Sequence, residues 1–324
     1  MKSAMLAPPS RSSKHYLALC GGVGGAKLAL GLAHVLPSDQ LTIVVNTGDD
    51  FEHLGLSISP DIDTVTYTLA GLVQPDQGWG RSDDSFTALD TVKRLGGETW
   101  FQLGDKDIGL HLMRSMMLDQ GLSLSAVTAR IAGRLGVAHE IAPMTDDIVR
   151  TVLDTANGLM PFQHYFVKAH CAPVITGIKY LGAEKARLSA ALKRALSNPN
   201  LSGVFICPSN PYLSIDPILA LADVRTMLAS TPAPVIAVAP IVGGGAIKGP
   251  TVKIMRELAI EPSAAAVATH YIDFLDGYIV DAADRVVLSD VQVIPFEIVM
   301  NTLADKVTLA NRCLAFSDEL AGQR

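Results

Sequence analysis

The feature that most constrains the fold is a short apolar strand that runs directly into a run of glycines. The strand covers residues 16–20, and Gly21-Gly22-Val23-Gly24-Gly25 follows it, ahead of an Ala/Leu-rich helix and a second apolar strand at 41–45. A glycine-dense turn before a helix N-terminus leaves backbone N–H groups to bind an anion, and the helix dipole favours negative charge there. The stretch therefore predicts a βαβ unit with a phosphate site at its first turn.

The glycine run matches neither of two standard phosphate-binding patterns. The dinucleotide fingerprint requires a glycine where Lys27 stands, and the Walker A pattern requires Gly-Lys-Ser/Thr where Gly25-Ala26-Lys27 stands. We place Lys27 in the first helical turn, where a cation opposes the helix dipole unless an anion lies nearby. The alternative is a turn that only packs the strand against the helix.

Pairs of carboxylates follow this unit. Asp49 and Asp50 come directly after the second strand, and Asp61 and Asp63 follow in the next loop. Ligands of a parallel α/β sheet bind at the carboxyl ends of its strands, so we expect both loops to face one crevice. Hard oxygen ligands beside a phosphate site are typical of Mg²⁺, which makes Asp49 and Asp61 candidate metal ligands. Alternatively, Asp61 caps a helix expected at 63–72, and Asp49-Asp50 form a solvated turn.

The pattern of buried parallel strands resumes in the second half of the chain. An apolar strand at 201–206 leads into Pro208-Ser209-Asn210-Pro211, whose Ser209 and Asn210 present hydrogen-bonding groups at a strand end. A second glycine-rich loop spans 240–245 and continues to Lys248-Gly249-Pro250. Two such loops predict that both halves of the sheet hold one extended ligand.

These patterns predict a Rossmann-like, doubly wound α/β fold with a mainly parallel sheet and an inserted capping subdomain. At 324 residues with 49% hydrophobic content, the chain is long enough for one large α/β domain with an appendage. We expect a flexible tail at 1–15, a core formed by 16–104 and 199–324, and the cap at 105–198, where the pattern is shorter and more mixed.

A helix expected to begin near residue 105 carries polar residues at helical spacing. Asp107, His111 and Arg114 share one face, and Met113 lies on the face expected to be apolar. A solvated ladder of charges and a substrate-facing surface are both consistent with this spacing.

Composition excludes several classes of function. The net charge is −6 and the basic residues are scattered, so a nucleic-acid footprint is absent. Apolar runs are interrupted before they could span a membrane, and residues 1–15 lack the apolar run of a signal peptide. The four cysteines are far apart and predict neither a disulfide framework nor a zinc site. We expect a cytoplasmic enzyme.

Six motifs, in order along almost the whole chain, resemble those of the 2-phospho-L-lactate transferase family. They are Gly21-Gly-Val-Gly-Gly-Ala-Lys27, Val45-Asn-Thr-Gly-Asp-Asp50, Ser59-Pro-Asp-Ile-Asp-Thr64, Leu103-Gly-Asp-Lys-Asp107, Pro143-Met-Thr-Asp-Asp147 and Pro208-Ser-Asn-Pro211. The resemblance implies transfer of a phospho-three-carbon-acid group from a guanosine diphosphate-linked donor to 7,8-didemethyl-8-hydroxy-5-deazariboflavin. It implies release of GMP and a precursor of coenzyme F-420 as the product. The sequence leaves open whether the acid is lactate, enolpyruvate or glycerate.

The resemblance also implies roles for individual residues. The expected donor contacts are Gly22, Val23, Gly24, Gly25, Ser209 and Asn210, to which the dipole argument adds Lys27. Asp49 and Asp61 would hold Mg²⁺, and Asp63 would contact the deazaflavin, so that Asp49 and Asp63 are the candidate catalytic residues. Archaeal members of the family often carry a lysine where this chain has Gln102, which leaves the deazaflavin contact there open.

Two other functions are weighed against the transferase. A non-catalytic nucleotide-sugar-binding regulator of a sister family would continue the second strand with Asp-Asp-Gly-Gly-Ser, whereas Phe51-Glu52-His53 follows Asp50 here. An NAD-dependent oxidoreductase needs an acidic residue at the end of that strand, where Asn46 stands. The transferase is therefore favoured, and we expect it to be a homodimer.

Overall fold

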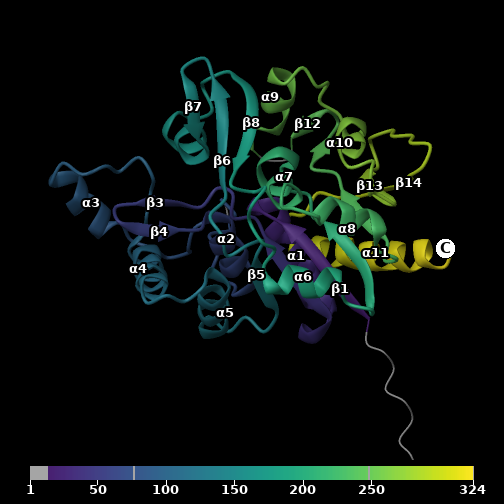
Figure 1. Ribbon diagram of the computed structural model, residues 1–324, viewed down its shortest axis with the longest axis horizontal. Coiled ribbons are helices and arrows are strands. Elements are labelled where there is room, and N and C mark those ends of the chain that lie inside the picture. Colours follow the sequence, from purple (N-terminus) through teal and green to yellow (C-terminus); the bar gives the residue numbers. More distant parts are fainter. Residues whose placement is uncertain (1–13, 76, 247–248, 324) are drawn as a thin grey trace, which may run out of the picture.

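The computed structural model describes residues 14–323, except 76, 247 and 248. Its centre is a seven-stranded sheet whose neighbouring strands all run parallel. In chain order its strands are β1 (His15–Cys20), β2 (Leu41–Val45), β5 (Glu140–Pro143), β9 (Leu201–Ile206), β10 (Val235–Val238), β13 (Gly277–Asp281) and β14 (Gln292–Phe296). Figure 1 shows the helices arranged around this sheet.

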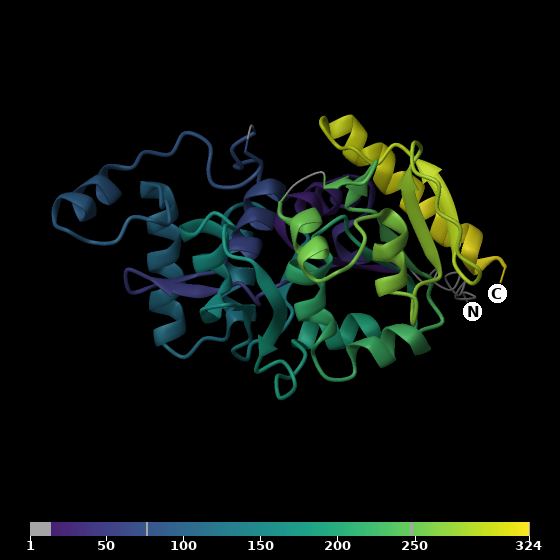
Figure 2. The ribbon, with the colours of Figure 1, turned by 90° about the horizontal axis from the view of Figure 1, so that it is seen from above.

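Helices cover both faces of the sheet, which explains why β1 and β2 are mostly apolar and almost entirely buried. On one face, α1 (Gly22–Val35) packs between α2 (Pro60–Leu69) and the C-terminal α11 (Leu303–Ala321). On the other face, α6 (Ala190–Leu196) packs against β1 and β2, as a right-handed crossover requires. Seen from above, α11 (yellow) lies along one side of the molecule and the green helices before β10 along the other (Figure 2).

The strand order is β14-β13-β10-β9-β1-β2-β5. The chain therefore builds outward from β1 in one direction through β2 and β5, and then in the other direction from β9. The sheet reverses its winding between β1 and β9, and ligands of doubly wound folds bind at such a switch point. The predicted Rossmann-like, doubly wound α/β fold is confirmed.

Beyond β9 the connections carry short helices and one small hairpin. They are η3 (Pro211–Ile215), α7 (Asp216–Leu219), α8 (Val224–Ser230), α9 (Thr251–Glu257) and α10 (Ala264–His270), with β11 (Ile241–Val242) and β12 (Gly245–Ala246) forming the hairpin. This hairpin is the glycine-rich loop expected at 240–245. Lys248, which was expected to extend that loop, lies outside the described residues.

The segment expected as an inserted cap, 105–198, holds a second, antiparallel sheet of three strands in the order β7-β6-β8. Its elements are α4 (Asp105–Asp119), α5 (Leu124–Arg134), β6 (Arg150–Thr155), β7 (Gly158–Pro161), η2 (His164–Lys168) and β8 (Ile175–Leu181). The same segment also contributes strand β5 to the main sheet and helix α6 to one of its faces. The expected boundaries therefore cut across that sheet, because β5 is a four-residue strand ending in Pro143, and its proline-containing sequence was interpreted as a loop.

Smaller elements lie around the first half of the sheet. Residues 51–60, expected as a loop, form the hairpin of β3 (Phe51–His53) and β4 (Leu56–Ile58). The remaining elements are η1 (Ser38–Gln40) and α3 (Thr87–Arg94). The helix expected at 63–72 is α2, which begins three residues earlier at Pro60.

The expected tail at 1–15 falls mostly outside the described residues, which begin at Lys14. Lys14 forms an exposed ion pair with Asp318 of α11, and His15 is the first residue of β1. Within the described ranges, the helices are all too short or too polar to cross a membrane.

Candidate active site at the carboxyl ends of the strands

The loops that follow β1 and β9 are in direct contact at the switch point. The Gly21 amide donates to the Ser209 hydroxyl over 3.2 Å, and that hydroxyl donates to the Gly21 carbonyl over 2.8 Å. A Cβ at Gly24 would lie 2.1 Å from the Pro208 carbonyl oxygen. Only glycine lets the helix approach this loop so closely. The structure thus brings together the two loops that carry the predicted donor contacts.

Ser209 and Asn210, the predicted donor contacts on the β9 side, both hold the shape of their loop. Ser209 is buried against Gly21. The Asn210 side-chain oxygen accepts from the amides of Tyr212 and Leu213, each over 3.0 Å, and thereby caps η3. Their contact with a donor stays a prediction, and the loop that carries them lies at the predicted place.

Helix α1 begins at Gly22, so the glycine run forms its first turn. The amides of a first turn have no acceptor within their own helix. The Gly22 amide donates to Asp61 Oδ1 over 2.7 Å, which places a carboxylate at the positive end of the α1 dipole. Val23 and Gly24 lie in the same turn, so this end of α1 is built to accept an anion.

The prediction that Asp61 caps its own helix is wrong. Ser59 is the N-cap residue of α2 and Pro60 is its first residue, so Asp61 lies inside the first turn. Pro60 sets the start of the helix because proline is favoured at the first helical position. The Asp61 carboxylate thus bonds to α1 and Asn46.

Lys27 is the sixth residue of α1 and lies in the second turn, so its placement in the first turn is wrong. Only Gly21 separates the end of β1 from the start of α1, so the helix starts earlier than a longer glycine turn would allow. The Lys27 ammonium donates to the Met300 carbonyl over 2.6 Å. The dipole argument for Lys27 as a donor contact therefore loses its basis.

Asn46, the residue directly after β2, joins two of the predicted carboxylates. Its side-chain nitrogen donates to Asp49 Oδ1 and to Asp61 Oδ2, each over 3.0 Å. All three residues are buried, which contradicts the alternative of a solvated turn at Asp49-Asp50. A single amide thus holds both candidate metal ligands at the end of β2.

The carboxylates of this group carry raised pKa values. Burial and the nearby charges of Asp61 and Asp50 raise the pKa of Asp49 well above its ordinary value. Burial raises the pKa of Asp61 to about 6, although hydrogen bonds from Asn46 and Gly22 act in the opposite direction. Burial also raises the pKa of Asp50 to about 7. Negative charge on these residues is therefore costly without a nearby cation.

The donor chemistry fits a magnesium ion. Asp49 and Asp61 supply hard carboxylate oxygens, and Asp50 Oδ1 is a buried oxygen without a hydrogen-bond partner in the described structure. Among the described residues, no cluster of three or more His, Cys, Asp or Glu side chains surrounds one point. Mg²⁺ commonly takes only one or two carboxylates and completes its shell with water and substrate phosphates.

Asp63 lies two residues after Asp61 in α2, on another side of the helix, and forms an ion pair. Its carboxylate accepts two hydrogen bonds from Arg114 of α4, one of them 3.0 Å long. His111 Nδ1 lies 3.7 Å from Asp63 Oδ2. The structure thus separates Asp63, on the α4 side of α2, from Asp61, which faces α1.

The buried and exposed faces of α4 differ from both predicted alternatives. His111 and Arg114 are buried against α2 and β4, and Asp107 accepts a hydrogen bond from the Tyr67 hydroxyl over 2.7 Å. Of the face expected to be apolar, Leu110 and Met117 are buried as predicted, whereas Met113 is 47% exposed. The polar face turns inward because acceptors on α2 and β4 satisfy its charges.

Aromatic residues from three segments meet beside this region. Trp100 contacts His53 and His164 with ring centroids 5.0 Å and 4.9 Å apart, and Phe51 and Phe101 complete the group. We call these five residues the aromatic cluster. His164 also lines a cavity of about 370 Å³.

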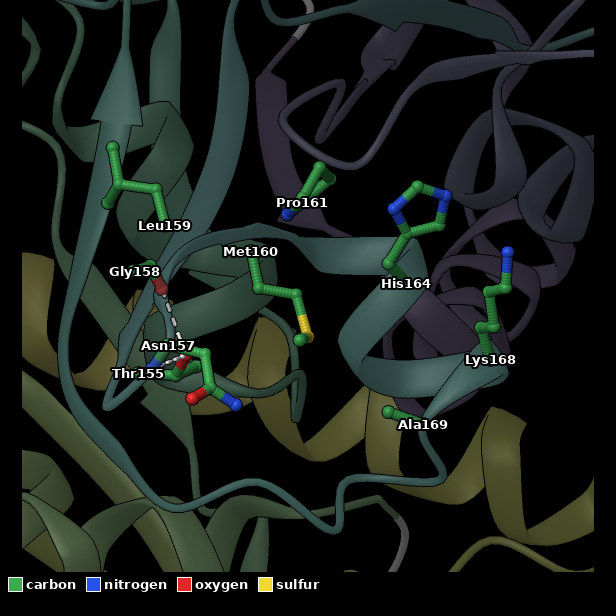
Figure 3. Close-up of a pocket in the computed structure, with 9 residues that line it drawn as sticks. All are labelled: Thr155, Asn157, Gly158, Leu159, Met160, Pro161, His164, Lys168 and Ala169. Atoms are coloured by element: carbon green, nitrogen blue, oxygen red, sulfur yellow. Dashed lines mark hydrogen bonds between the residues drawn. The ribbon is translucent and has the colours of Figure 1, made fainter.

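Figure 3 shows the residues that line this cavity, with Met160 between Asn157 on one side and His164 on the other. It is lined by the β6–β7 turn, β7 and η2. Gln163, from the same segment, donates to the Asp49 carbonyl over 3.4 Å. The segment between β7 and η2 therefore reaches the acidic group at the end of β2.

Sequence reasoning missed Asn46 and Gln163 as parts of the site, and it placed Arg114 on a polar helix face without identifying its partner Asp63. Asn46 was considered only as evidence against a dinucleotide site, although an amide at the end of a buried strand is itself a signal. Gln163 comes from a distant segment, and its sequence context gives no sign of the contact with Asp49.

Comparisons with known proteins agree on one family. A family model described as 2-phospho-L-lactate transferase CofD matches residues 17–303. The phosphoenolpyruvate transferase of Kitasatospora aureofaciens is 40% identical over 276 residues, which cover 83% of this chain and 85% of that protein. The 2-phospho-L-lactate transferase of Methanococcoides burtonii is 39% identical over 264 residues, covering 82% and 85%.

A solved structure supports the fold independently. A protein of the UPF0052 family from Bacillus halodurans superposes with a TM-score of 0.61 and covers 93% of this chain and 99% of its own. Its sequence is only 15% identical, so this similarity concerns the fold alone.

Proposed function

This chain belongs to the family of the 2-phospho-L-lactate transferase CofD and is a transferase, and from this premise we propose its reaction. The enzyme moves a phospho-three-carbon-acid group from a guanosine diphosphate-linked donor to the terminal ribityl hydroxyl of 7,8-didemethyl-8-hydroxy-5-deazariboflavin. The hydroxyl oxygen forms a bond to the β-phosphorus, the bond to the bridging oxygen breaks, and GMP leaves. The product enters coenzyme F-420 biosynthesis.

The observation that carries this proposal is the meeting of three features at the switch point. The first turn of α1, the Pro208–Pro211 loop and the carboxylates Asp49 and Asp61 all lie at the carboxyl ends of β1, β2 and β9. A diphosphate needs an anion site and a counter-charge within the same small volume.

We assign the donor diphosphate to the amides at the start of α1. Gly22, Val23, Gly24 and Gly25 would bind its oxygens, and the Ser209-Asn210 loop would contact the guanosine side. In this structure the Asp61 carboxylate accepts the hydrogen bond from the Gly22 amide. A donor phosphate that takes this amide would free the Asp61 carboxylate for a cation.

Asp49 and Asp61 would hold Mg²⁺, which supplies charge neutralisation at the phosphates when it is bound. The protein itself holds both carboxylates in place through Asn46 and limits their access to water by burial. This arrangement is suited to a reaction in which positioning and charge stabilisation provide most of the rate acceleration.

We place the deazaflavin between Asp63 and the aromatic cluster. A flat ring needs apolar walls, and the cluster combines β3, the segment before α4 and η2. The Arg114 ion pair would fix the Asp63 carboxylate for contact with the polar ribityl tail. Gln102, directly after Phe101 in the sequence, stands where archaeal members of the family often carry a lysine. This chain therefore lacks a lysine contact to the deazaflavin at that position.

The transferred three-carbon acid is lactate, enolpyruvate or glycerate. Relatives named for two of these acids have nearly the same sequence identity to this chain, 40% and 39%, so identity does not select one. A cytoplasmic location and a homodimer belong to the same proposal.

The test is to incubate the purified enzyme with Mg²⁺, the deazaflavin and each guanylylated acid, and to measure product masses and GMP. The proposal requires GMP and one phospho-acid-modified deazaflavin in equal amounts. It fails if none of the three donors reacts while the protein is folded and binds GDP.

A further inference from the structure

Ser214 is a buried serine whose side chain has no hydrogen-bond partner among the described residues. It belongs to η3, the helical turn that follows the Pro208–Pro211 loop, and is only 8% exposed. Its backbone amide donates to the Asn210 carbonyl over 3.0 Å, whereas its hydroxyl bonds to no described atom. Buried hydroxyls in proteins are nearly always paired, so this one calls for an explanation.

The Ser214 hydroxyl lies beside the first turn of α1. Ser214 Oγ is 3.9 Å from the position that a Cβ on Gly22 would take, and Asp61 Oδ1 is at the same distance from that position. The Gly22 amide donates to this Asp61 oxygen. Ser214 and Asp61 therefore both border the amide that we assign to the donor diphosphate.

The local backbone holds Ser214 in this place. The Asn210 side chain caps η3 through two backbone amides, and the Asn210 carbonyl accepts from the amides of Ser214 and Ile215. Helix η3 also packs against β1, the strand that ends just before α1. The position of Ser214 relative to Gly22 is thus fixed by backbone contacts and does not depend on the hydroxyl.

Close packing explains the Cβ of Ser214 but not its hydroxyl. Ser214 Cβ lies 2.8 Å from the position that a Cβ on Gly21 would take, so η3 and the glycine turn are in close contact there. Alanine has the same Cβ and would pack equally well. The hydroxyl is instead a donor next to another donor, the Gly22 amide, and two donors side by side suit the oxygens of an anion.

We propose that the Ser214 hydroxyl donates a hydrogen bond to a phosphate oxygen of the guanosine diphosphate-linked donor. This inference rests on the proposed function and adds a substrate contact to it. The phosphate would enter between Ser214 and Asp61 and take the Gly22 amide from Asp61. The hydroxyl and the amide then bind the same phosphate group. Asn210 contributes indirectly, because its carbonyl positions Ser214.

Isothermal titration calorimetry of the full chain with GDP and Mg²⁺ tests this contact. Ser214→Ala keeps the Cβ and removes only the hydroxyl. Hydrogen bonds to charged groups are among the stronger ones, so this loss should raise the Kd for GDP about 10–100-fold. Guanosine carries no phosphate, and its affinity should be the same for Ser214→Ala and wild type.

Ser317→Ala is the matched control, because Ser317 of α11 is a buried serine whose hydroxyl has a partner. It donates to the Ser202 carbonyl over 2.7 Å, at the start of β9 and therefore at the opposite end of the sheet from the glycine turn. This variant should lower the melting temperature of the protein and leave the Kd for GDP unchanged. Ser214→Ala should do the reverse, since it breaks no hydrogen bond within the described residues.

The possible results distinguish the contact from the reaction. If wild type binds GDP and Ser214→Ala binds it with the same Kd, the contact is wrong and the proposed function stands. If Ser214→Ala loses affinity for guanosine and GDP equally, Ser214 maintains the shape of its loop, which also overturns the contact. If wild type binds no GDP, the proposed function fails and this contact fails with it.

Discussion

The Arg114 guanidinium and the Asp63 carboxylate are joined by two parallel hydrogen bonds in the interior, across the contact between α4 and α2. Their side chains are only 2% and 9% exposed. The pair ties α4 to the helix whose first turn carries Asp61, and so connects the small elements at the edge to the acidic group at the end of β2. A bidentate pair also fixes orientation in a way that a lysine would not.

Arg114→Met should therefore be strongly destabilising, because it leaves the Asp63 charge buried without its partner. We expect a loss of about 3–5 kcal/mol in the free energy of unfolding. The double variant Asp63→Leu/Arg114→Met should lose less than Arg114→Met alone. Urea denaturation of the four proteins measures both effects, and additive losses would show that the two residues are not coupled.

Asp107 provides a pH-dependent prediction. Burial raises its pKa to about 6 from an ordinary 3.8, although the Tyr67 hydroxyl and Arg81 act in the opposite direction and Asp63 and Asp84 add to the rise. When the pKa of a group is higher in the folded state than in the unfolded state, its contribution to stability is fully present below the unfolded-state pKa. That contribution is lost as the pH rises through the folded-state pKa. At pH 7 the ionised Asp107 is therefore a net cost to folding.

Asp107→Asn removes this cost and keeps an oxygen that accepts from Tyr67. The variant should be more stable than wild type at pH 7, by about 1–3 kcal/mol, and the difference should vanish near pH 4. Burial lowers the pKa of His111 to about 4, so the neutral buried His111 makes the folded protein less stable as the pH falls below 6.5. Both proteins carry His111, and the difference between them isolates Asp107. Thermal unfolding from pH 4 to 8 measures it; parallel pH profiles would contradict the assignment.

Gly24 is predicted to tolerate no side chain. A Cβ there would lie 2.1 Å from the Pro208 carbonyl oxygen, so Gly24→Ala must push α1 and the Pro208 loop apart. We expect a loss of about 1–3 kcal/mol in stability, as for overpacked sites, together with weaker GDP binding. Gly133→Ala in α5 is the matched control. A Cβ at Gly133 would meet no described atom within 4 Å, so the substitution should raise the free energy of unfolding by about 0.5–1 kcal/mol. Equal melting temperatures for the two variants would refute the close approach.

The sequence predicted the sheet well because β1, β2 and β9 are buried on both faces and therefore mostly apolar. It also located the loops that bear Gly24, Asp49 and Ser209, since the ends of parallel strands share one edge. Strand β5 was missed because four residues ending in proline resemble a loop.

What the sequence could not predict was which way polar side chains point. The spacing of Asp107, His111 and Arg114 shows a shared face but not whether acceptors on another element bury it. The partner of Asp61 was similarly hidden, because a carboxylate in a first helical turn usually bonds its own helix, whereas this one bonds the start of α1. Such partners lie far apart in the chain and depend on the packed structure.

Asp49 is predicted to matter most for turnover. It shares the Asn46 amide with Asp61, and burial with two nearby carboxylates raises its pKa well above the ordinary value. Such a site favours a divalent cation, which would neutralise the donor diphosphate where charge develops on the leaving GMP. Asp49→Asn keeps the shape and removes one charge, so kcat should fall roughly 10²–10³-fold while GDP affinity changes much less.

Asp50→Asn is the comparison that isolates the role of Asp49. The Asp50 carboxylate accepts from the Ser59 hydroxyl over 2.7 Å and makes no hydrogen bond to Asn46 in the described structure, so its loss should lower kcat less. Steady-state kinetics across a Mg²⁺ titration separates the two variants. Asp49→Asn should need more Mg²⁺ for half-maximal rate, because one of two protein ligands is weakened. A variant with a near-normal rate and an unchanged Mg²⁺ requirement would mean that other residues hold the ion, and Asp61→Asn would then be the next variant to measure.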